Sequence, residues 1–258
     1  QRNIDELIIL DVEATRENRE PLYEAIKEYT SQLFCPLTVG GGIHKLEDIT
    51  KLLQAGADKV AINTSLLDNP SFVADAVQKF GAQAIVASIN NIYDHGINII
   101  CNSDGTQTQG IPTRKVCKYA EELGCGEILL TDVWANGTYQ GYNTDCIFEC
   151  SYDLSIPIIA YGGCGTLRHV VDALRAGSNA VASSSMFLHR DITPKDVSRF
   201  IQKEGFPSRI DNHTPINIEE AIDIYQILTK NDLTPEEIES IKSSYKKEFL
   251  HFMCPWVY

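Results

Sequence analysis

An internal repeat constrains this chain more than any other feature of its sequence. Residues 36–66 recur at residues 157–187, with nine of thirty-one positions identical at an ungapped offset of 121. The same offset aligns ELIILDVEAT at residues 6–15 with EILLTDVWAN at residues 127–136. A register that is kept across separate structural elements indicates a duplicated block and not a chance similarity. The sequence therefore predicts two similar halves.

Each copy has the pattern of a strand followed by a helix. A short apolar run ends in paired glycines, a helical apolar period follows, and an Ala-Gly pair closes the helix. The apolar runs lack strict alternation, which is typical of parallel strands that are buried on both faces. Duplicated units of this kind predict an α/β fold, specifically a (β/α)8 TIM barrel. Its predicted strands are Leu7–Val12, Pro36–Val39, Lys59–Asn63, Ala84–Asn90, Ile128–Val133, Ile158–Tyr161 and Ala180–Ser184.

The repeat also predicts the domain organisation. At the offset of 121, the strand at residues 84–90 has its counterpart before residue 1, so we expect the first βα unit to be missing from this sequence. The barrel is predicted to span residues 1–210, with a hairpin at residues 97–110 in the loop after its fifth strand. Residues 211–258 have no counterpart in the first half. They predict an extension of two helices, which begin at capping-box sequences at residues 217–220 and 234–237.

Composition excludes several classes of function. The chain has 258 residues, a net charge of -13 and an isoelectric point near 4.9, so it lacks the basic surface that nucleic acid or an anionic membrane requires. It has no long apolar segment and no signal peptide, which predicts a cytoplasmic protein. The cysteines and histidines have no metal-ligand spacing, so we expect no metal and no cofactor. Cys146 and Cys150, one helical turn apart, are interpreted as packing residues.

The paired glycines suggest a chemistry. A glycine turn at a strand's carboxyl end lets backbone N–H groups approach an anion with no Cβ in the way. Small donors follow the next strand in each half, and a further pair follows the strand at residues 128–133. The pattern predicts two phosphate sites at one barrel mouth, for a substrate with two separated phosphates. These sites comprise Gly41, Gly42, Asn63 and Thr64 in one half, and Gly162, Gly163, Ser184, Ser185, Asn136 and Gly137 in the other.

The segments VGGGI, GADKVAINT and GEILLTDV, together with the repeat, resemble the cyclase subunit of imidazole glycerol phosphate synthase. That family is a histidine-pathway barrel that receives ammonia from a glutaminase partner. The resemblance covers the chain from about Ile4 to Ile210. It implies phosphate contacts from Gly42, Asn63, Thr64, Gly137, Gly163, Ser184 and Ser185. It also implies substrate contacts from Thr38, Thr131 and Asn136, the last being an aspartate in the family.

The chain departs from the family at its catalytic positions. The family uses two aspartates as general acid and base, and the second of these positions is Asn90, while the first falls outside this sequence. An amide does not exchange a proton near neutral pH. Trp134 replaces a carboxylate in the substrate site, in the loop after the sixth barrel strand. Asp94 and Asp132 are candidate substitutes, although Asp132 should point out of the barrel because its neighbour Thr131 faces in.

The opposite end of the barrel matches the family more closely. Glu6, Lys59 and Glu127 correspond to three of four charged residues that gate ammonia entry, and the fourth is an arginine of the missing strand. Asp58 corresponds to a residue implicated in contact with the glutaminase. The alternative interpretation is that these are solvated charges at strand starts, without a role in a channel.

Three functions remain open at this point. The first is an ammonia conduit, similar to the barrel paralogues found with surface-polysaccharide genes. The segment ILDVEATRE resembles the sequences of those paralogues. There, a glutaminase and the barrel supply an ATP-dependent amidotransferase that converts an acetamido sugar, and the ligand is a phosphorylated small molecule or nucleotide sugar. The second is the lyase of histidine biosynthesis with a substituted residue at Asn90. The third is a catalytically silent phosphate-binding barrel. We favour the first.

Overall fold

The computed structural model of the chain describes residues 4–17, 19–31, 33–102, 105–106 and 108–208. The chain divides into two compact units, Gln1–Ile210 and Asp211–Tyr258. The two helices predicted for the C-terminal extension fall in the second unit and lie outside the described residues. Among the described residues, none of the helices is long and apolar enough to cross a membrane.

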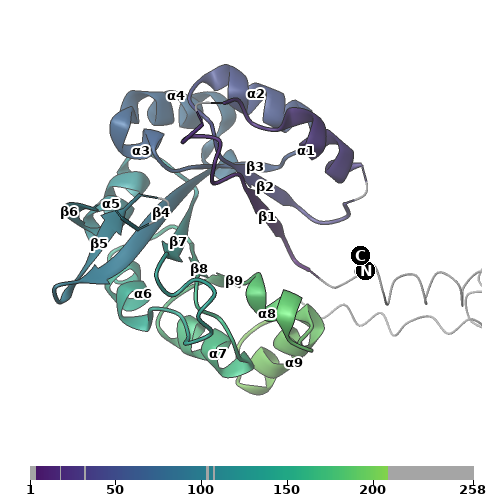
Figure 1. Ribbon diagram of the computed structural model, residues 1–258, viewed down its shortest axis with the longest axis vertical. Coiled ribbons are helices and arrows are strands. Elements are labelled where there is room, and N and C mark those ends of the chain that lie inside the picture. The colour runs from purple at the N-terminus through teal and green to yellow at the C-terminus, as the bar shows by residue number, and fades with distance from the viewer. Residues whose placement is uncertain (1–3, 18, 32, 103–104, 107, 209–258) are drawn as a thin grey trace, which may run out of the picture. The chain divides into compact units, whose positions relative to one another are not determined.

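A curled sheet of parallel strands forms the centre of the first unit (Figure 1). Seven strands follow one another in chain order, and each pairs in parallel with the next. They are β1 (Leu7–Leu10), β2 (Leu37–Gly40), β3 (Lys59–Ile62), β4 (Ile85–Asp94), β7 (Glu127–Asp132), β8 (Ile158–Tyr161) and β9 (Ala180–Ala182). All seven predicted barrel strands are confirmed, and with them the α/β barrel architecture.

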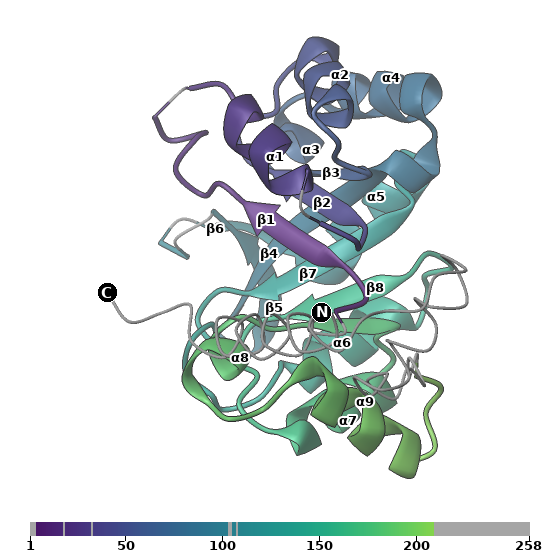
Figure 2. The same ribbon diagram turned by 90° about the vertical axis from the view of Figure 1, so that its right-hand side faces the viewer.

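Helices cover the outer side of the curl, as Figures 1 and 2 show. They are α1 (Tyr23–Thr30), α2 (Leu46–Gln54), α3 (Ser65–Asp68), α4 (Pro70–Phe80), α5 (Thr113–Glu122), α6 (Thr144–Ser151), α7 (Leu167–Arg175), α8 (Ser185–His189) and α9 (Pro194–Lys203), with a 3-10 turn, η1, at Ala82–Ala84. Side-chain caps explain several helix starts. Asn143 accepts from the Cys146 backbone N–H at 3.0 Å, and Thr193 with Asp196 forms a capping box at the start of α9.

The duplication is visible in the structure. Helices α1 and α6, helices α2 and α7, and strands β2 and β8 each begin and end 121 residues apart. Three kinds of hydrogen bond recur at the same offset. Thr30 donates to the Ala55 carbonyl at 2.7 Å, and Ser151 donates to the Ala176 carbonyl at 3.3 Å. Asp58 accepts from the Leu37 N–H at 2.8 Å, and Asn179 accepts from the Ile158 N–H at 3.0 Å. Asp11 accepts from the Ala14 N–H at 3.2 Å, and Asp132 accepts from the Ala135 N–H at 2.9 Å.

A hairpin extends from the carboxyl end of β4. Strand β4 continues to Asp94, turns at His95 and Gly96 with φ of 47° and 85°, and pairs antiparallel with β5 (Ile97–Cys101), which pairs with β6 (Thr108–Pro112). Positive φ at both turn residues suits the right-handed twist of a two-residue hairpin loop. The hairpin prediction is confirmed. The predicted end of the fifth barrel strand at Asn90 was wrong, because β4 continues through residues 91–94, which pair antiparallel with β5.

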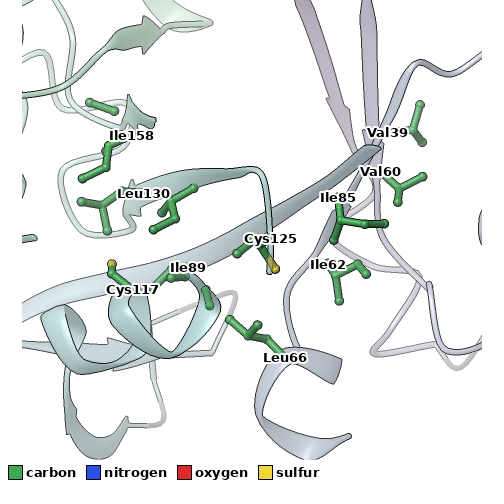
Figure 3. Packing of buried hydrophobic residues seen from close by; sticks show 14 of the residues in the cluster. Val39, Val60, Ile62, Leu66, Ile85, Ile89, Cys117, Cys125, Leu130 and Ile158 are labelled. Atoms are coloured by element: carbon green, nitrogen blue, oxygen red, sulfur yellow. The ribbon is translucent and has the colours of Figure 1, made fainter. Parts of the chain in front are cut away.

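The core has two parts, one on each side of the sheet. The larger part lies between the sheet and the helices, where Figure 3 shows Val39, Val60, Ile62 and Ile85 packed together. The smaller part lies inside the curl and is formed by Ala61, Val86, Leu129 and Ile159. Among the described residues, five cysteines are buried, all in the larger part, which confirms their interpretation as small core residues: Cys117, Cys125, Cys146, Cys150 and Cys164.

The described sheet is an open curl. Strand β1 pairs with β2 and strand β9 pairs with β8, and no other described strand adds to either outer edge. Parallel strands place all their carboxyl ends at one rim of the curl, and this rim is called the mouth below. The opposite rim is called the base.

Candidate functional site

The mouth contains a row of neutral polar side chains on the inner side of the sheet. Asn90 lies opposite Thr131 in the strand register, and Thr131 lies opposite Tyr161. All three point inward, because Val86, Leu129 and Ile159, an even number of residues earlier in the same strands, form the inner cluster. Thr131 is 8 % exposed, and its Oγ1 is buried with no hydrogen-bond partner among the described residues.

Thr38 does not belong to this row. It is buried on β2, where its register partners are Ile8 and Lys59, and it lies two residues before the end of the strand. The structure therefore places this predicted substrate contact below Gly40, deeper in the curl than Asn90 and Thr131.

The paired glycines are required by close backbone packing. Gly41 and Gly162 have φ of 111° and 104°, and a Cβ on them would lie 2.2 Å from the carbonyl oxygen of Asp11 and 2.4 Å from that of Asp132. Gly163 has φ of 91°, and a Cβ there would lie 2.0 Å from the carbonyl oxygen of Gly141. Both turns therefore bring backbone against the neighbouring strand's loop, in a left-handed conformation that other residues rarely adopt.

The small donors predicted beside the glycine turns lie at the same rim. Strands β3 and β9 neighbour β2 and β8, so Asn63 and Thr64 follow the strand next to Gly41, and Ser184 and Ser185 follow the strand next to Gly162. The Asn63 amide donates to the Ser88 carbonyl at 2.8 Å. The Ser184 hydroxyl lies 3.3 Å from the Tyr161 hydroxyl.

The loop after β7 carries the remaining predicted mouth residues. Trp134 is 54 % exposed, and its Nε1 lies 2.9 Å from the position of a Cβ on Gly105, so the indole packs against the connection between β5 and β6. Asn136 and Gly137 are exposed, and Gly137 has φ of 78° with open space around it. The structure thus holds Trp134 beside the hairpin and leaves Asn136 and Gly137 free of packing constraints.

The two candidate replacement carboxylates do not join the inner row. Asp132 is buried on the helix-facing side of β7, where it accepts from the Ala135 N–H at 2.9 Å and from the Asn143 amide at 2.9 Å. Asp94 lies at the tip of the hairpin beside His95, with 3.7 Å between the carboxylate and the imidazole Nε2. Neither carboxylate is placed to exchange a proton with a ligand inside the curl.

Sequence reasoning missed two features of the mouth. Tyr161 was not singled out, although the repeat offset pairs it with Gly40 and so marks a difference between the halves. A buried hydrogen-bond network on the outer side of β4 was also missed. Asn91 accepts from Thr113 at 2.6 Å, and the side chain of Asn98 in β5 accepts from Asn143 at 3.0 Å. The network links the hairpin to the starts of α5 and α6. Its members are far apart in the sequence, so only the folded structure reveals it.

The base contains an ion cluster centred on Lys59. Its ammonium donates to Glu127 at 2.7 Å and to Glu6 at 3.1 Å, and it is 16 % exposed. Burial alone would lower the pKa of Lys59, but the hydrogen bonds to Glu127 and Glu6 hold it above its ordinary value. The second carboxylate oxygen of Glu127 is buried with no hydrogen-bond partner in the described part of the chain. The three predicted gate residues therefore meet at one point and leave one acceptor unused.

Asp58 lies near the base and has a structural contact of its own. Its carboxylate accepts from the Leu37 backbone N–H at 2.8 Å, which anchors the start of β2. It also lines a surface pocket of about 290 Å³ together with Phe34, which is 86 % exposed. The hydrogen bond to the backbone is sufficient to explain why an aspartate stands at position 58, with no partner protein involved. The exposed ring of Phe34 adds an apolar surface at the same place.

Metal ligands are not gathered anywhere in the described ranges, where no group of three or more His, Cys, Asp or Glu side chains could hold a metal ion. The inner row at the mouth offers an amide and hydroxyls, and the loop after β1 adds an ion pair of Arg19 with Asp11, 2.8 Å from Nη2 to Oδ1.

The unpartnered hydroxyl of Thr131 predicts an unusual response to mutation. Thr131→Val removes a buried hydroxyl that forms no bond in the described protein, so we expect the free energy of unfolding to stay constant or to rise by about 1 kcal/mol. Thr113→Val is the matched control, because Thr113 is also buried but donates to Asn91 at 2.6 Å. It should lower the free energy of unfolding by about 1–3 kcal/mol. Equal losses in denaturant titrations of the two variants would contradict this description of Thr131.

Comparison with known proteins gives the family. The profile of the family described as "Histidine biosynthesis protein" matches residues 1–193. The chain is 39 % identical over 211 residues to imidazole glycerol phosphate synthase subunit HisF of Thermobifida fusca, covering 80 % of this chain and 82 % of that protein. It is 38 % identical over 213 residues to the subunit HisF of Wolinella succinogenes, covering 81 % and 84 %. A HisF of Clostridium botulinum is 37 % identical over 210 residues, covering 80 % and 83 %. The chain belongs to the HisF family of histidine biosynthesis proteins.

Proposed function

We propose that this chain is an ammonia-receiving barrel subunit that works with a glutaminase, and that the ammonia serves amidation or amidination of a surface-polysaccharide sugar. The acceptor reaction takes place on a separate ATP-dependent amidotransferase. The glutaminase partner is inferred from the relatives, which are named as subunits of imidazole glycerol phosphate synthase. The sugar is inferred from the resemblance of the segment at residues 9–17 to barrel paralogues of polysaccharide pathways.

One observation carries this proposal: the inward-facing mouth residues of β4, β7 and β8 are Asn90, Thr131 and Tyr161, and none is a carboxylate. A cyclase of this family closes a ring by moving protons, which needs a group that titrates near the working pH. An amide does not meet this need. Asp132 points to the opposite side of the sheet and is occupied by Ala135 and Asn143.

The base supports the conduit role. Lys59 of β3, Glu127 of β7 and Glu6, which directly precedes β1, converge on one ion cluster facing the interior. Partly buried charges cost desolvation energy, and a barrel that needed only to fold would be as stable with apolar residues there. A polar, hydrogen-bonding entrance suits a small polar molecule such as ammonia. This also weighs against a catalytically silent binding barrel, for which the cluster has no use.

The repeated turns at the mouth support the proposal of a phosphorylated ligand. The glycine turns at residues 41–42 and 162–163 lie beside Asn63–Thr64 and Ser184–Ser185, in two places related by the repeat. The ligand proposed is a phosphorylated small molecule or nucleotide sugar, held through backbone N–H groups and hydroxyls. Asn136 and Gly137 would contribute from the exposed loop after β7.

The second candidate is the lyase of histidine biosynthesis. Its support is the identity of 36–39 % to proteins named HisF over four fifths of this chain. In that case another residue would perform the proton transfer that Asn90 does not perform.

The proposal is tested with the purified full-length protein. We expect it to form a stoichiometric complex with a glutaminase subunit and to show negligible ammonia-dependent turnover of the bisphosphate substrate of the HisF family. Complex formation without turnover supports the conduit. Turnover at the rate of a HisF enzyme favours the lyase, and the absence of any glutaminase complex favours the silent barrel.

A further inference from the structure

Three buried thiols meet between helices α5 and α6. Cys117 lies on α5, while Cys146 and Cys150 lie one turn apart on α6, and all three are almost completely buried. They belong to the part of the core between the sheet and the helices. The Cys150 thiol lies within hydrogen-bonding reach of the thiols of both Cys117 and Cys146. The cluster is therefore a contact of three sulfur atoms inside the protein.

The fold does not require sulfur at these positions of α6. Helix α1 is the counterpart of α6 at the repeat offset, and it has Ala25 and Tyr29 where α6 has Cys146 and Cys150. Equivalent helices of the same fold are thus formed with and without thiols. A free cysteine packs like a small apolar residue, and its reactivity is what distinguishes it from one.

Hydrogen bonding makes Cys150 the most reactive of the three thiols. Hydrogen bonds from Cys117 and Cys146 hold the pKa of Cys150 below its ordinary value, although burial acts in the opposite direction. The hydrogen bonds to Cys150, together with burial, raise the pKa values of Cys117 and Cys146. The thiolate is the nucleophilic form of cysteine, so oxidation of the cluster starts at Cys150.

Disulfide geometry favours a bond between the two helices over a bond within α6. Side chains one helical turn apart have Cβ atoms about 5–6 Å apart, whereas a disulfide needs a Cβ separation of about 3.8 Å. A bridge between Cys146 and Cys150 would therefore distort α6. Cys117 approaches Cys150 from another helix and is free of this restriction, which makes it the preferred partner.

A small polar cavity adjoins the cluster. Its volume is about 10 Å³, and its lining includes Cys146 together with Asn91, Asp132 and Asn143. A polar cavity of this size has room for about one water molecule. A small polar oxidant can therefore come next to the thiols. Anything larger than water needs a local opening of the helix pair, so oxidation should be slow.

We propose that Cys150 and Cys117 are a redox modification site, at which a peroxide produces a reversible disulfide between α6 and α5. The Cys150 thiolate attacks one peroxide oxygen, the O–O bond breaks, and the departing hydroxide takes up a proton to become water. The sulfur of Cys117 then attacks the resulting sulfenic acid, an S–S bond forms, and the sulfenic hydroxyl leaves as water with the Cys117 proton. Two thiols are oxidised, and one peroxide is reduced to two molecules of water. A dithiol reductant reverses the change.

The bridge acts on the hairpin at the mouth. Helix α5 begins at Thr113, which donates to Asn91 of β4 at 2.6 Å. Helix α6 is capped by Asn143, which donates to Asn98 of β5 at 3.0 Å. Both helices thus hold the hairpin at their first turn. A covalent link within two turns of these contacts fixes the spacing between the two points of attachment.

Peptide mapping after oxidation tests the proposal. The full-length folded protein is treated with hydrogen peroxide, its remaining thiols are alkylated, and its peptides are identified by mass spectrometry. We expect the peptides of Cys117 and Cys150 to be linked, and the link to disappear after dithiothreitol. Cys125 is the internal control, because it is buried in the same core, its burial raises the pKa of its thiol to about 11, and Figure 3 shows it apart from Cys117. It should stay reduced.

Two variants and a melting curve complete the test. Cys146→Ala should keep the link between Cys117 and Cys150, whereas Cys150→Ala should lose it. The oxidised unmodified protein should melt about 5–10 °C above the reduced protein, because a cross-link between these positions restricts the unfolded chain. Mapping and melting of the unmodified protein remain decisive if a variant folds poorly.

Three results would overturn the inference. Alkylation of Cys117 and Cys150 as complete as that of Cys125 would show that the cluster does not react. A link found only between Cys146 and Cys150 would place the bridge within α6. A link that forms only in denaturant, or that leaves the melting temperature unchanged, would not belong to the folded protein. None of these results bears on glutaminase binding or turnover, so the proposed function is tested separately.

Discussion

Gly163→Ala is expected to lower the free energy of unfolding by about 3–5 kcal/mol, the loss associated with forced backbone movement in a buried site. Gly163 is buried, and a Cβ there would lie 2.0 Å from the Gly141 carbonyl oxygen. The contact involves two stretches of backbone, because the Gly141 N–H also donates to the Gly163 carbonyl at 2.8 Å. Neither stretch can move without breaking this bond. Denaturant titration followed by circular dichroism measures the loss.

Gly137→Ala separates crowding from backbone conformation. Gly137 has φ of 78°, close to that of Gly163, but nothing lies within 4 Å of the position of its Cβ. Only the cost of the left-handed conformation remains, about 1–2 kcal/mol. If both variants lost the same amount, the tight packing of the glycine turn on the loop after β7 would not be present in solution.

Lys59→Met should lower the free energy of unfolding by about 2 kcal/mol, between the values typical of exposed and fully buried pairs. The change leaves Glu6 and Glu127 without their shared cation, and their side chains are 42 % and 22 % exposed. The loss should depend on pH. The pKa of Lys59 is raised on folding, so its contribution is complete below its ordinary value of 10.5 and disappears as the pH rises through the folded-state pKa. The difference between parent and variant should therefore narrow in alkaline solution.

Lys51→Met is the matched control for this prediction. Lys51 pairs with Glu20 at 3.4 Å on the surface, where the two side chains are 49 % and 56 % exposed. Its removal should cost less than about 1 kcal/mol. A Lys59 variant that behaves like the Lys51 variant, with no pH dependence of the difference, would show that the base cluster is an ordinary solvated ion pair.

Much of the barrel was predictable because the chain contains the same block twice. One copy of a glycine turn is weak information, but Gly41 and Gly162 in register, with Asp58 and Asn179 following at the same offset, indicate a shared structure. The hairpin was only partly predictable. Its strand at residues 97–101 was expected, while the extension of β4 beyond Asn90 was missed because the polar residues Asn91 and Asp94 interrupt the apolar run of that strand.

The parts of the site that were not predictable depend on contacts between distant residues. The amide of Asn98 donates to the Glu149 carboxylate at 3.1 Å, although the two residues are fifty-one positions apart in the sequence. No local sequence pattern predicts such a bond. Cys117 in α5 packs in the same core as Cys146 and Cys150 of α6, which the spacing of the latter two does not reveal. The outward direction of the Asp132 side chain was predictable, in contrast, because successive residues along a strand face opposite sides of the sheet.

The most direct test of the central claim is ammonia-dependent turnover of the HisF-family bisphosphate substrate, measured for the full-length protein and for Asn90→Asp. We expect no turnover by the unmodified protein and none by Asn90→Asp, with glutaminase binding retained in both. That result would mean that the barrel keeps the route for ammonia and leaves the chemistry to another enzyme. Turnover by the unmodified protein would rule out the conduit role and identify a histidine-pathway lyase whose proton transfer has moved to another residue.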